Sequence, residues 1–403
     1  LEPIGVYLKS YMDALLLLAE SRGYVMNTGT GPVEWDLEAI VEALNAGEPY
    51  DAFVAQLAEA HLTRHGALGI DGTPAPMLLQ NGFTDDVFPP REGLKLYNDL
   101  HRRFENPDVV LLMGDYGHSR SANRDLAAEA FNDIATEFFN SRLKDEGDGP
   151  APGSVFVYEM TCPAVGDDAA LERGPFTAPS WRELAPERVG FGADGVQTVA
   201  WLGGDPSVGL NFDPIPQTNP LFGTFDPCKT VPPPTWPPGT VATADLNVDE
   251  AFTMAGLPTI RADVVTVGSF GQLNGRLYDV DAEGNHRLIT RGTYRLEPNQ
   301  SGEIVFQLQG NAYTFEAGRT ILLELAPSDA PTFRQPDRPF VVEVTDLSIE
   351  LPVLAAGSAP GDVEGGDGSG GGGAAIPATG GGAAAAMLIA LTSASIVRRR
   401  RVG

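Results

Sequence analysis

The feature that most constrains the fold is a pair of apolar segments of strand length, each of which runs into a turn that carries an ionisable side chain. The first, residues 76–90, carries Asp85 and Asp86 in its turn, and the second, residues 109–118, leads to His118. Apolar residues recur at helical spacing across the intervening residues 91–103, which predicts an amphipathic helix. Strand, acid, helix, strand and histidine therefore follow one another in this stretch, which predicts an α/β arrangement here.

The order of acid and histidine matches the second half of an α/β-hydrolase, in which the nucleophile comes first along the chain. The histidine of a Ser-His-Asp triad takes the proton of the serine hydroxyl, and the carboxylate holds that histidine in the required tautomer. His118 follows an apolar strand in a glycine-rich turn, so it can project from the end of a sheet toward a site. We therefore interpret His118 as the base of a triad and either Asp85 or Asp86 as its acid.

The nucleophile of this triad is missing from the sequence. No Gly-x-Ser-x-Gly elbow occurs. The nearest match surrounds Ser269, which follows the acid and the histidine and so stands in the wrong order, and Ser119 is merely the neighbour of His118. We expect the chain to be a fragment whose serine lies upstream of Leu1, and we expect the fragment alone to be inactive.

The composition excludes several partners and cofactors. The chain has 54 Asp and Glu against 27 Lys and Arg, a net charge of −27, and such a surface repels nucleic acid. Its two cysteines, Cys162 and Cys228, lack the spacing of a zinc site, so we expect no metal and no cofactor. Two separate buried thiols and one disulfide both fit the sequence, and we favour the disulfide because the chain bears signs of export.

Changes of texture divide the 403 residues into five parts. Residues 1–70 have the apolar spacing of helices over 8–20, 36–45 and 50–65. The α/β-hydrolases insert a cap at this point of the chain, although flanking helices of the sheet fit equally well. The third part has short β-rich runs between Pro and Gly clusters, which is typical of a β-sandwich. The expected parts are a helical cap (1–70), an α/β-hydrolase portion (71–146), a jelly roll (147–354), a flexible Gly-rich linker (355–375) and a tail (376–403).

The sandwich region resembles the C-terminal jelly roll of the X-Pro dipeptidyl-peptidase and cocaine-esterase (CocE/NonD) family of serine hydrolases. The resemblance rests on RLYDVDAEG, RLITRG, YTFEAG and PSDAPTF, which begin at residues 276, 287, 313 and 327. The segment GFTDDVF at 82–88 is also similar to the family's acid motif and implies that Asp85 is the acid, with Asp86 as the alternative. In this family the jelly roll packs against the catalytic domain and helps to shape the substrate pocket. Arg319 departs from the family, which often has a histidine there.

The tail resembles the cell-wall sorting signal of Gram-positive surface proteins. An LPxTG-like pentapeptide, IPATG at 376–380, precedes an apolar run over about 383–397 and four arginines at 398–401. The resemblance implies that a sortase cleaves between Thr379 and Gly380 and joins the protein to the wall. A C-terminal hydrophobic helix that anchors the protein in the membrane is the alternative.

We therefore predict an α/β fold followed by an all-β jelly roll, in a serine hydrolase displayed outside the cell. Its substrate is a peptide cleaved after Xaa-Pro or an ester, and the sequence does not indicate an oligomeric state. The alternative is a wall-anchored module without catalysis, whose jelly roll binds carbohydrate or protein. An upstream Gly-x-Ser-x-Gly elbow would favour the enzyme, and its absence the binding module.

Overall fold

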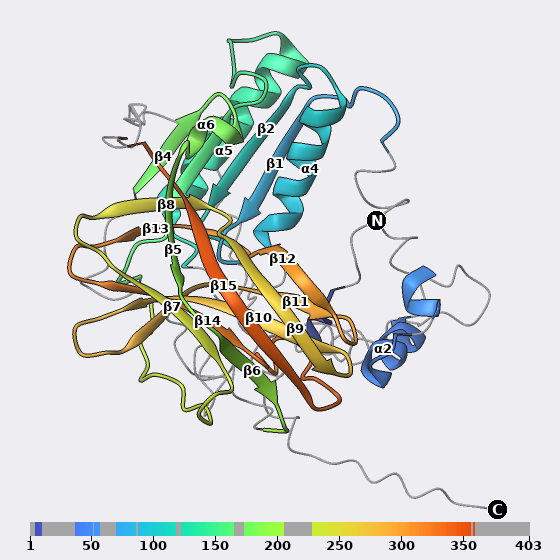
Figure 1. Ribbon diagram of the computed structural model, residues 1–403. Coiled ribbons are helices and arrows are strands. Elements are labelled where there is room, and N and C mark those ends of the chain that lie inside the picture. Colours follow the sequence, from blue (N-terminus) through green and yellow to red (C-terminus); the bar gives the residue numbers. More distant parts are fainter. Residues whose placement is uncertain are drawn as a thin grey trace, which may run out of the picture.

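The computed structural model describes residues 5–9, 37–50, 52–56, 70–85, 88–117, 122–164, 173–204, 228–355 and 358. These residues form an α/β sheet that packs against one end of a β-sandwich (Figure 1). The strands β1 and β2 run toward the sandwich, so their carboxyl ends face the junction between the two parts (Figure 1).

The α/β part is a 4-stranded sheet in the order β1-β2-β3-β4. The first three strands are parallel and the last is antiparallel. Their bounds are β1 Met77–Gly82, β2 Val109–Gly114, β3 Val155–Glu159 and β4 Arg173–Ala178. A parallel sheet is covered on both faces, which explains why β2 is a continuous apolar run and is buried along its whole length.

One helix covers each face of this sheet. Helix α4 (Pro90–Arg103) packs Leu94, Tyr97 and Leu100 in the same cluster as Leu111 of β2. Helix α5 (Asp125–Phe139) packs in a second cluster with Leu112, the next residue of β2. The helix expected over 91–103 is thus present. Helix α5 continues into a π-helical turn, η3 (Asn140–Lys144).

The boundary that we expected between residues 146 and 147 is wrong. Leu111 of β2 pairs with Val155 of β3, and β4 pairs with β3, so the α/β sheet extends to residue 178. The apolar segment of β3 has the texture of the sandwich strands that follow it. The sequence does not distinguish them because sheet membership is set by pairing over long distances.

The sandwich consists of a 7-stranded sheet and a 4-stranded sheet. The first has the path β12-β9-β15-β8-β13, with β5 and β6 also on β15, and the second has the order β11-β10-β14-β7. A short helix, α6 (Trp181–Leu184), precedes these strands, which are β5 Glu187–Ala193, β6 Gln197–Trp201, β7 Ala242–Asn247, β8 Phe252–Gly256, β9 Thr259–Gly268, β10 Gly271–Val280, β11 His286–Leu296, β12 Ser301–Gln307, β13 Asn311–Phe315, β14 Thr320–Ala326 and β15 Phe340–Val353. The main core lies between the two sheets.

The two parts share packing at their junction. Ala255 of β8 and Ala312 of β13 belong to the same apolar cluster as Val157 of β3. The Met160 N–H donates to the carbonyl of Ala312 at 2.8 Å, which continues the chain of β3 onto the edge of the sandwich. The α/β sheet and the sandwich are therefore joined by packing as well as by the chain.

Of the expected N-terminal helices, the one over 36–45 corresponds to α2 (Leu37–Ala46). Residues 52–56 are also helical, while most of the helices expected at 8–20 and 50–65 lies outside the described residues. After α2, Glu48 binds Arg295 of β11, with 3.0 Å between Oε2 and Nη2.

The expected linker, apart from residues 355 and 358, and the expected sorting signal and apolar helix of the tail also lie outside the described residues. Among the residues that are described, no helix is long and apolar enough to cross a membrane.

Cys162 and Cys228 form a disulfide, as expected, with their Cα atoms 5.5 Å apart. Cys162 follows β3, and Cys228 precedes β7, so the bond ties the end of the α/β sheet to the sandwich. The two cysteines are 66 residues apart in the sequence.

Replacing both cysteines by serine should lower the free energy of unfolding by about 4 kcal/mol, the loop-entropy value for a closure of 66 residues. Urea unfolding of the variant and of the oxidised wild type measures the difference. Dithiothreitol should destabilise the wild type by a similar amount and leave the variant unchanged. Equal stability of the oxidised wild type and the variant would contradict the prediction.

Candidate functional site

The candidate site begins where β1 and β2 end side by side. Gly82 of β1 pairs with Gly114 of β2, so the turns that follow the two strands emerge together. These turns pass close to each other: a Cβ atom on Gly82 would lie 1.6 Å from the carbonyl oxygen of Tyr116. Only glycine at position 82 leaves room for this approach.

Asp85 lies in the first turn with 7% of its surface exposed. Its Oδ1 atom accepts the backbone N–H of Phe88 at 2.9 Å, which fixes the orientation of the carboxylate. The second turn brings Gly117 against that carboxylate, since a Cβ atom on Gly117 would lie 2.5 Å from Oδ2 of Asp85. Gly117 has a φ of +134°, a conformation that favours glycine.

The structure therefore places the backbone just before His118 beside Asp85. His118 itself, Ser119 and the alternative acid Asp86 lie outside the described residues. Ser269 lies in the sandwich, between β9 and β10. The turns that follow β1 and β2 come much earlier along the chain.

A second carboxylate, Asp115, links the two turns. Its Oδ1 atom accepts the hydroxyl of Thr84 at 2.6 Å and the backbone N–H of Ala122 at 3.1 Å. Thr84 and Asp115 are both buried. Sequence reasoning missed this pair because nothing in the spacing of a lone Thr and a lone Asp indicates that they meet.

Tyr116 closes the site from the side of α5. Its hydroxyl donates to the carbonyl of Leu112 at 2.9 Å, and its ring meets that of Phe131 edge to face. Burial raises the pKa of the Tyr116 hydroxyl well above its ordinary value, and the negative charge of Asp85 adds to this. Tyr116 is therefore a neutral donor at all physiological pH values.

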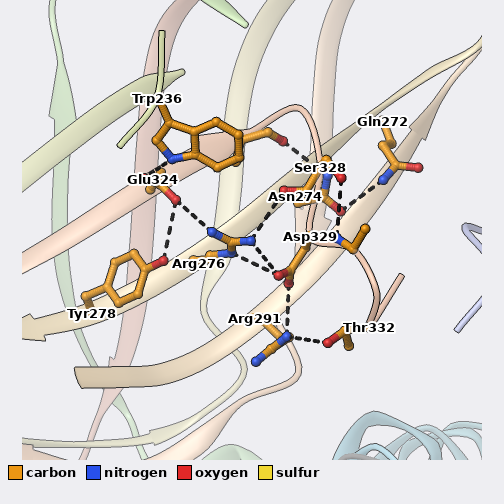
Figure 2. A network of polar contacts seen from close by, with 12 residues as sticks. Trp236, Gln272, Asn274, Arg276, Tyr278, Arg291, Glu324, Ser328, Asp329 and Thr332 are labelled. Carbon is orange, nitrogen blue, oxygen red and sulfur yellow. Dashed lines mark hydrogen bonds and ion pairs between the residues drawn. The ribbon is translucent and has the colours of Figure 1, made fainter. Parts of the chain in front are cut away.

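A larger group of charged side chains lies in the sandwich (Figure 2). Arg276 is fully buried and binds Asp329, with 2.5 Å between Nη2 and Oδ1, and Glu324, with 3.3 Å between Nη1 and Oε1. Arg291 binds the other oxygen of Asp329 at 3.2 Å. Trp236 donates its indole N–H to Glu324 at 2.9 Å.

The electrostatics of this group follow from burial and pairing. Burial opposes the charge of Arg276, but Asp329 and the other neighbouring groups hold its pKa well above the ordinary value. Burial raises the pKa of Glu324, while the charge of Arg276 opposes the shift. The charges of Arg276 and its two carboxylates are directed at one another (Figure 2), which indicates that the group fixes the loop after β14, which carries Asp329, to the strands β10, β11 and β14 of one sheet.

The motifs that carry the family resemblance supply most of this group. Arg276 and Arg291 come from RLYDVDAEG and RLITRG, and Asp329 comes from PSDAPTF. The sequence alone indicates turns in these segments. The atypical Arg319 also has a partner, because its Nε and Nη2 atoms bind the two oxygens of Asp279 at 2.8 and 2.9 Å.

The described residues contain no group of three or more His, Cys, Asp or Glu side chains that could hold a metal ion.

Comparison with known proteins agrees with this architecture. Residues 222–347 match the X-Pro dipeptidyl-peptidase C-terminal non-catalytic domain. No curated protein matches the sequence.

Three solved structures share the fold. An aminopeptidase from a marine sediment archaeon of the Thaumarchaeota aligns with a TM-score of 0.56 and 17% identity, over 88% of this chain and 65% of its own. An α-amino acid ester hydrolase aligns with a TM-score of 0.53 and 16% identity, over 87% and 65%. A CocE/NonD family hydrolase from Staphylococcus aureus aligns with a TM-score of 0.51 and 11% identity, over 87% and 63%.

The chain thus spans 63–65% of the length of these structures. The domain match covers most of the sandwich strands, and the similarity to these three structures extends to the α/β sheet as a shared fold.

Replacing Gly117 by alanine should lower the free energy of unfolding by about 1–3 kcal/mol more than the same change at Gly302. Both glycines have a positive φ, +134° and +107°, but only at Gly117 would the new Cβ meet another group, the Asp85 carboxylate. Urea unfolding of the two variants measures the difference. Equal losses would show that Gly117 does not press against Asp85.

Replacing Asp329 by alanine should cost about 3–5 kcal/mol, because it leaves Arg276 and Arg291 buried without their shared carboxylate. The matched control is Glu303→Ala, which breaks an exposed pair with Arg261 at 3.7 Å and should cost at most about 1 kcal/mol. Urea unfolding gives both values. A loss at Asp329 as small as that at Glu303 would contradict the structural role of the buried group.

Proposed function

We propose that this chain carries the acid and the base of a serine hydrolase related to the CocE/NonD enzymes. Asp85 would orient His118, and His118 would act as the general base. The observation that carries the proposal is the contact between the two turns: the backbone of Gly117, one residue before His118, lies against the buried Asp85 carboxylate. The same contact supports the choice of Asp85 as the acid.

In this mechanism, one ring N–H of His118 donates a hydrogen bond to the Asp85 carboxylate, and the other ring nitrogen accepts the proton of a serine hydroxyl as the hydroxyl attacks the substrate carbonyl. The imidazolium that forms is stabilised by the carboxylate and then protonates the leaving group. The serine is supplied by a part of the hydrolase domain that this sequence does not contain, because no Gly-x-Ser-x-Gly elbow occurs in it.

The names of the structural neighbours suggest the substrate class. One is an aminopeptidase and another an α-amino acid ester hydrolase, and both names specify an amino acid that contributes to the scissile bond. We infer that the substrate is a peptide, with cleavage after Xaa-Pro as one form, or an ester of similar size.

Display outside the cell is part of the proposal. The LPxTG-like tail supports anchoring to wall or membrane, and the Cys162–Cys228 disulfide is of the kind that persists in oxidising compartments.

In the protein that contains the whole hydrolase domain, His118→Ala and Asp85→Asn should each lower kcat at least about 10³-fold, because the serine loses its base or the orientation of that base. Xaa-Pro amides and short acyl esters serve as substrates. A fluorophosphonate probe, which reacts only with an activated serine, gives a readout that does not depend on the substrate.

Asp86→Asn is the matched control and should leave most of the activity. If Asp86 is the more sensitive position, the acid has been assigned one residue too early. The 403-residue chain by itself should not react with the probe. Labelling of that chain at Ser119 or Ser269 would overturn the proposal that its nucleophile lies elsewhere.

A further inference from the structure

The side chain of Asn123 holds the backbone at Gly117, the residue just before His118. The Oδ1 atom of Asn123 accepts the N–H of Gly117 at 2.8 Å, and its Nδ2 donates to the carbonyl of Gly117 at 3.1 Å. These two groups belong to the peptide bonds on either side of Gly117, and the second is the bond to His118. Asn123 thus fixes the direction in which the backbone enters residue 118.

The backbone of Asn123 is itself held in place. Its N–H donates to the carbonyl of Asp115 at 3.2 Å, and its φ of +51° lies in the left-handed region that asparagine tolerates better than most residues. Asp115 in turn accepts the hydroxyl of Thr84, the residue just before Asp85. The side-chain clasp of Asn123 is therefore connected to the turn that carries the acid.

Arg124, the residue after Asn123, binds a different part of the fold. The Nη2 atom of Arg124 donates to the carbonyl of Thr161 at 2.7 Å and to that of Pro163 at 3.0 Å. These two carbonyls flank Cys162, which the disulfide ties to Cys228. The chain that leaves the His118 segment is thereby attached to a cross-linked part of the fold.

We propose that Asn123 is a positioning residue, which holds the backbone at Gly117 so that His118 meets Asp85 and the serine. This proposal rests on the proposed function. A general base must lie within hydrogen-bond reach of both partners, and a displacement of about 1 Å costs roughly 10²-fold in rate. Gly117 has no side chain that could restrain its backbone. The two hydrogen bonds from Asn123 supply this restraint at the residue just before the base.

The test is Asn123→Gly in the protein that contains the whole hydrolase domain. Glycine adopts a φ of +51° without strain, so the change removes the side-chain clasp alone. We expect kcat to fall about 10- to 100-fold while KM stays within about twofold. The pH profile of kcat/KM should also differ from that of the wild type, because the proposed contact between the base and its acid is weakened in the variant.

The matched control is Asn299→Gly, since Asn299 has a φ of +54° in the turn between β11 and β12. It makes the same backbone change far along the chain from the site and should leave kcat, KM and the pH profile as in the wild type. The folded fraction of each variant is measured by urea unfolding, so unfolded protein does not enter kcat.

Each outcome decides the proposal. Wild-type kcat and pH profile in Asn123→Gly, together with an inactive His118→Ala, would overturn the positioning role and leave the proposed function in place. Equal losses in Asn123→Gly and Asn299→Gly, or a change in KM alone, would also overturn it. An active His118→Ala would overturn both the positioning role and the proposed function.

Discussion

The parallel pairing of β1 with β2 is the interaction on which the candidate site depends. Its register sets Gly82 opposite Gly114, so the turns that carry Asp85 and Gly117 leave the sheet at the same level. The pairing is held by the burial of β2 on both faces, under α4 and α5. A shift by one residue would exchange the two faces and separate the turns.

Polar groups serve two different purposes in this molecule. In the sandwich, charged side chains are buried and directed at one another, as Arg276 is at Asp329, and such pairs determine how loops dock while contributing little net stability. At the ends of β1 and β2, polar side chains instead bind backbone groups of turns, as Asn123 does at Gly117. The first arrangement fixes a loop on the strands of one sheet, and the second determines the path of a turn at the candidate site.

Several elements were predictable from local signals. The helix over 91–103 follows from apolar spacing, the helix over 36–45 appears as α2, and the β-rich half forms a sandwich. The disulfide was expected because the chain bears signs of export, and it is present. The prediction that assigned β3 to the sandwich was wrong. Its apolar run fits either sheet, and helix α5 separates it in the sequence from its partner β2.

The sequence by itself determined the order of chemistry, an acid after one strand and a histidine after the next, because local residue patterns encode strands and turns. Only the tertiary structure decided that Gly117 lies on the Asp85 carboxylate, that Thr84 meets Asp115, and that Asn123 clasps the intervening turn. These contacts join residues whose side chains carry no periodic signal. Their meeting depends on strand register and on the paths of two turns, which form only when the whole sheet is packed.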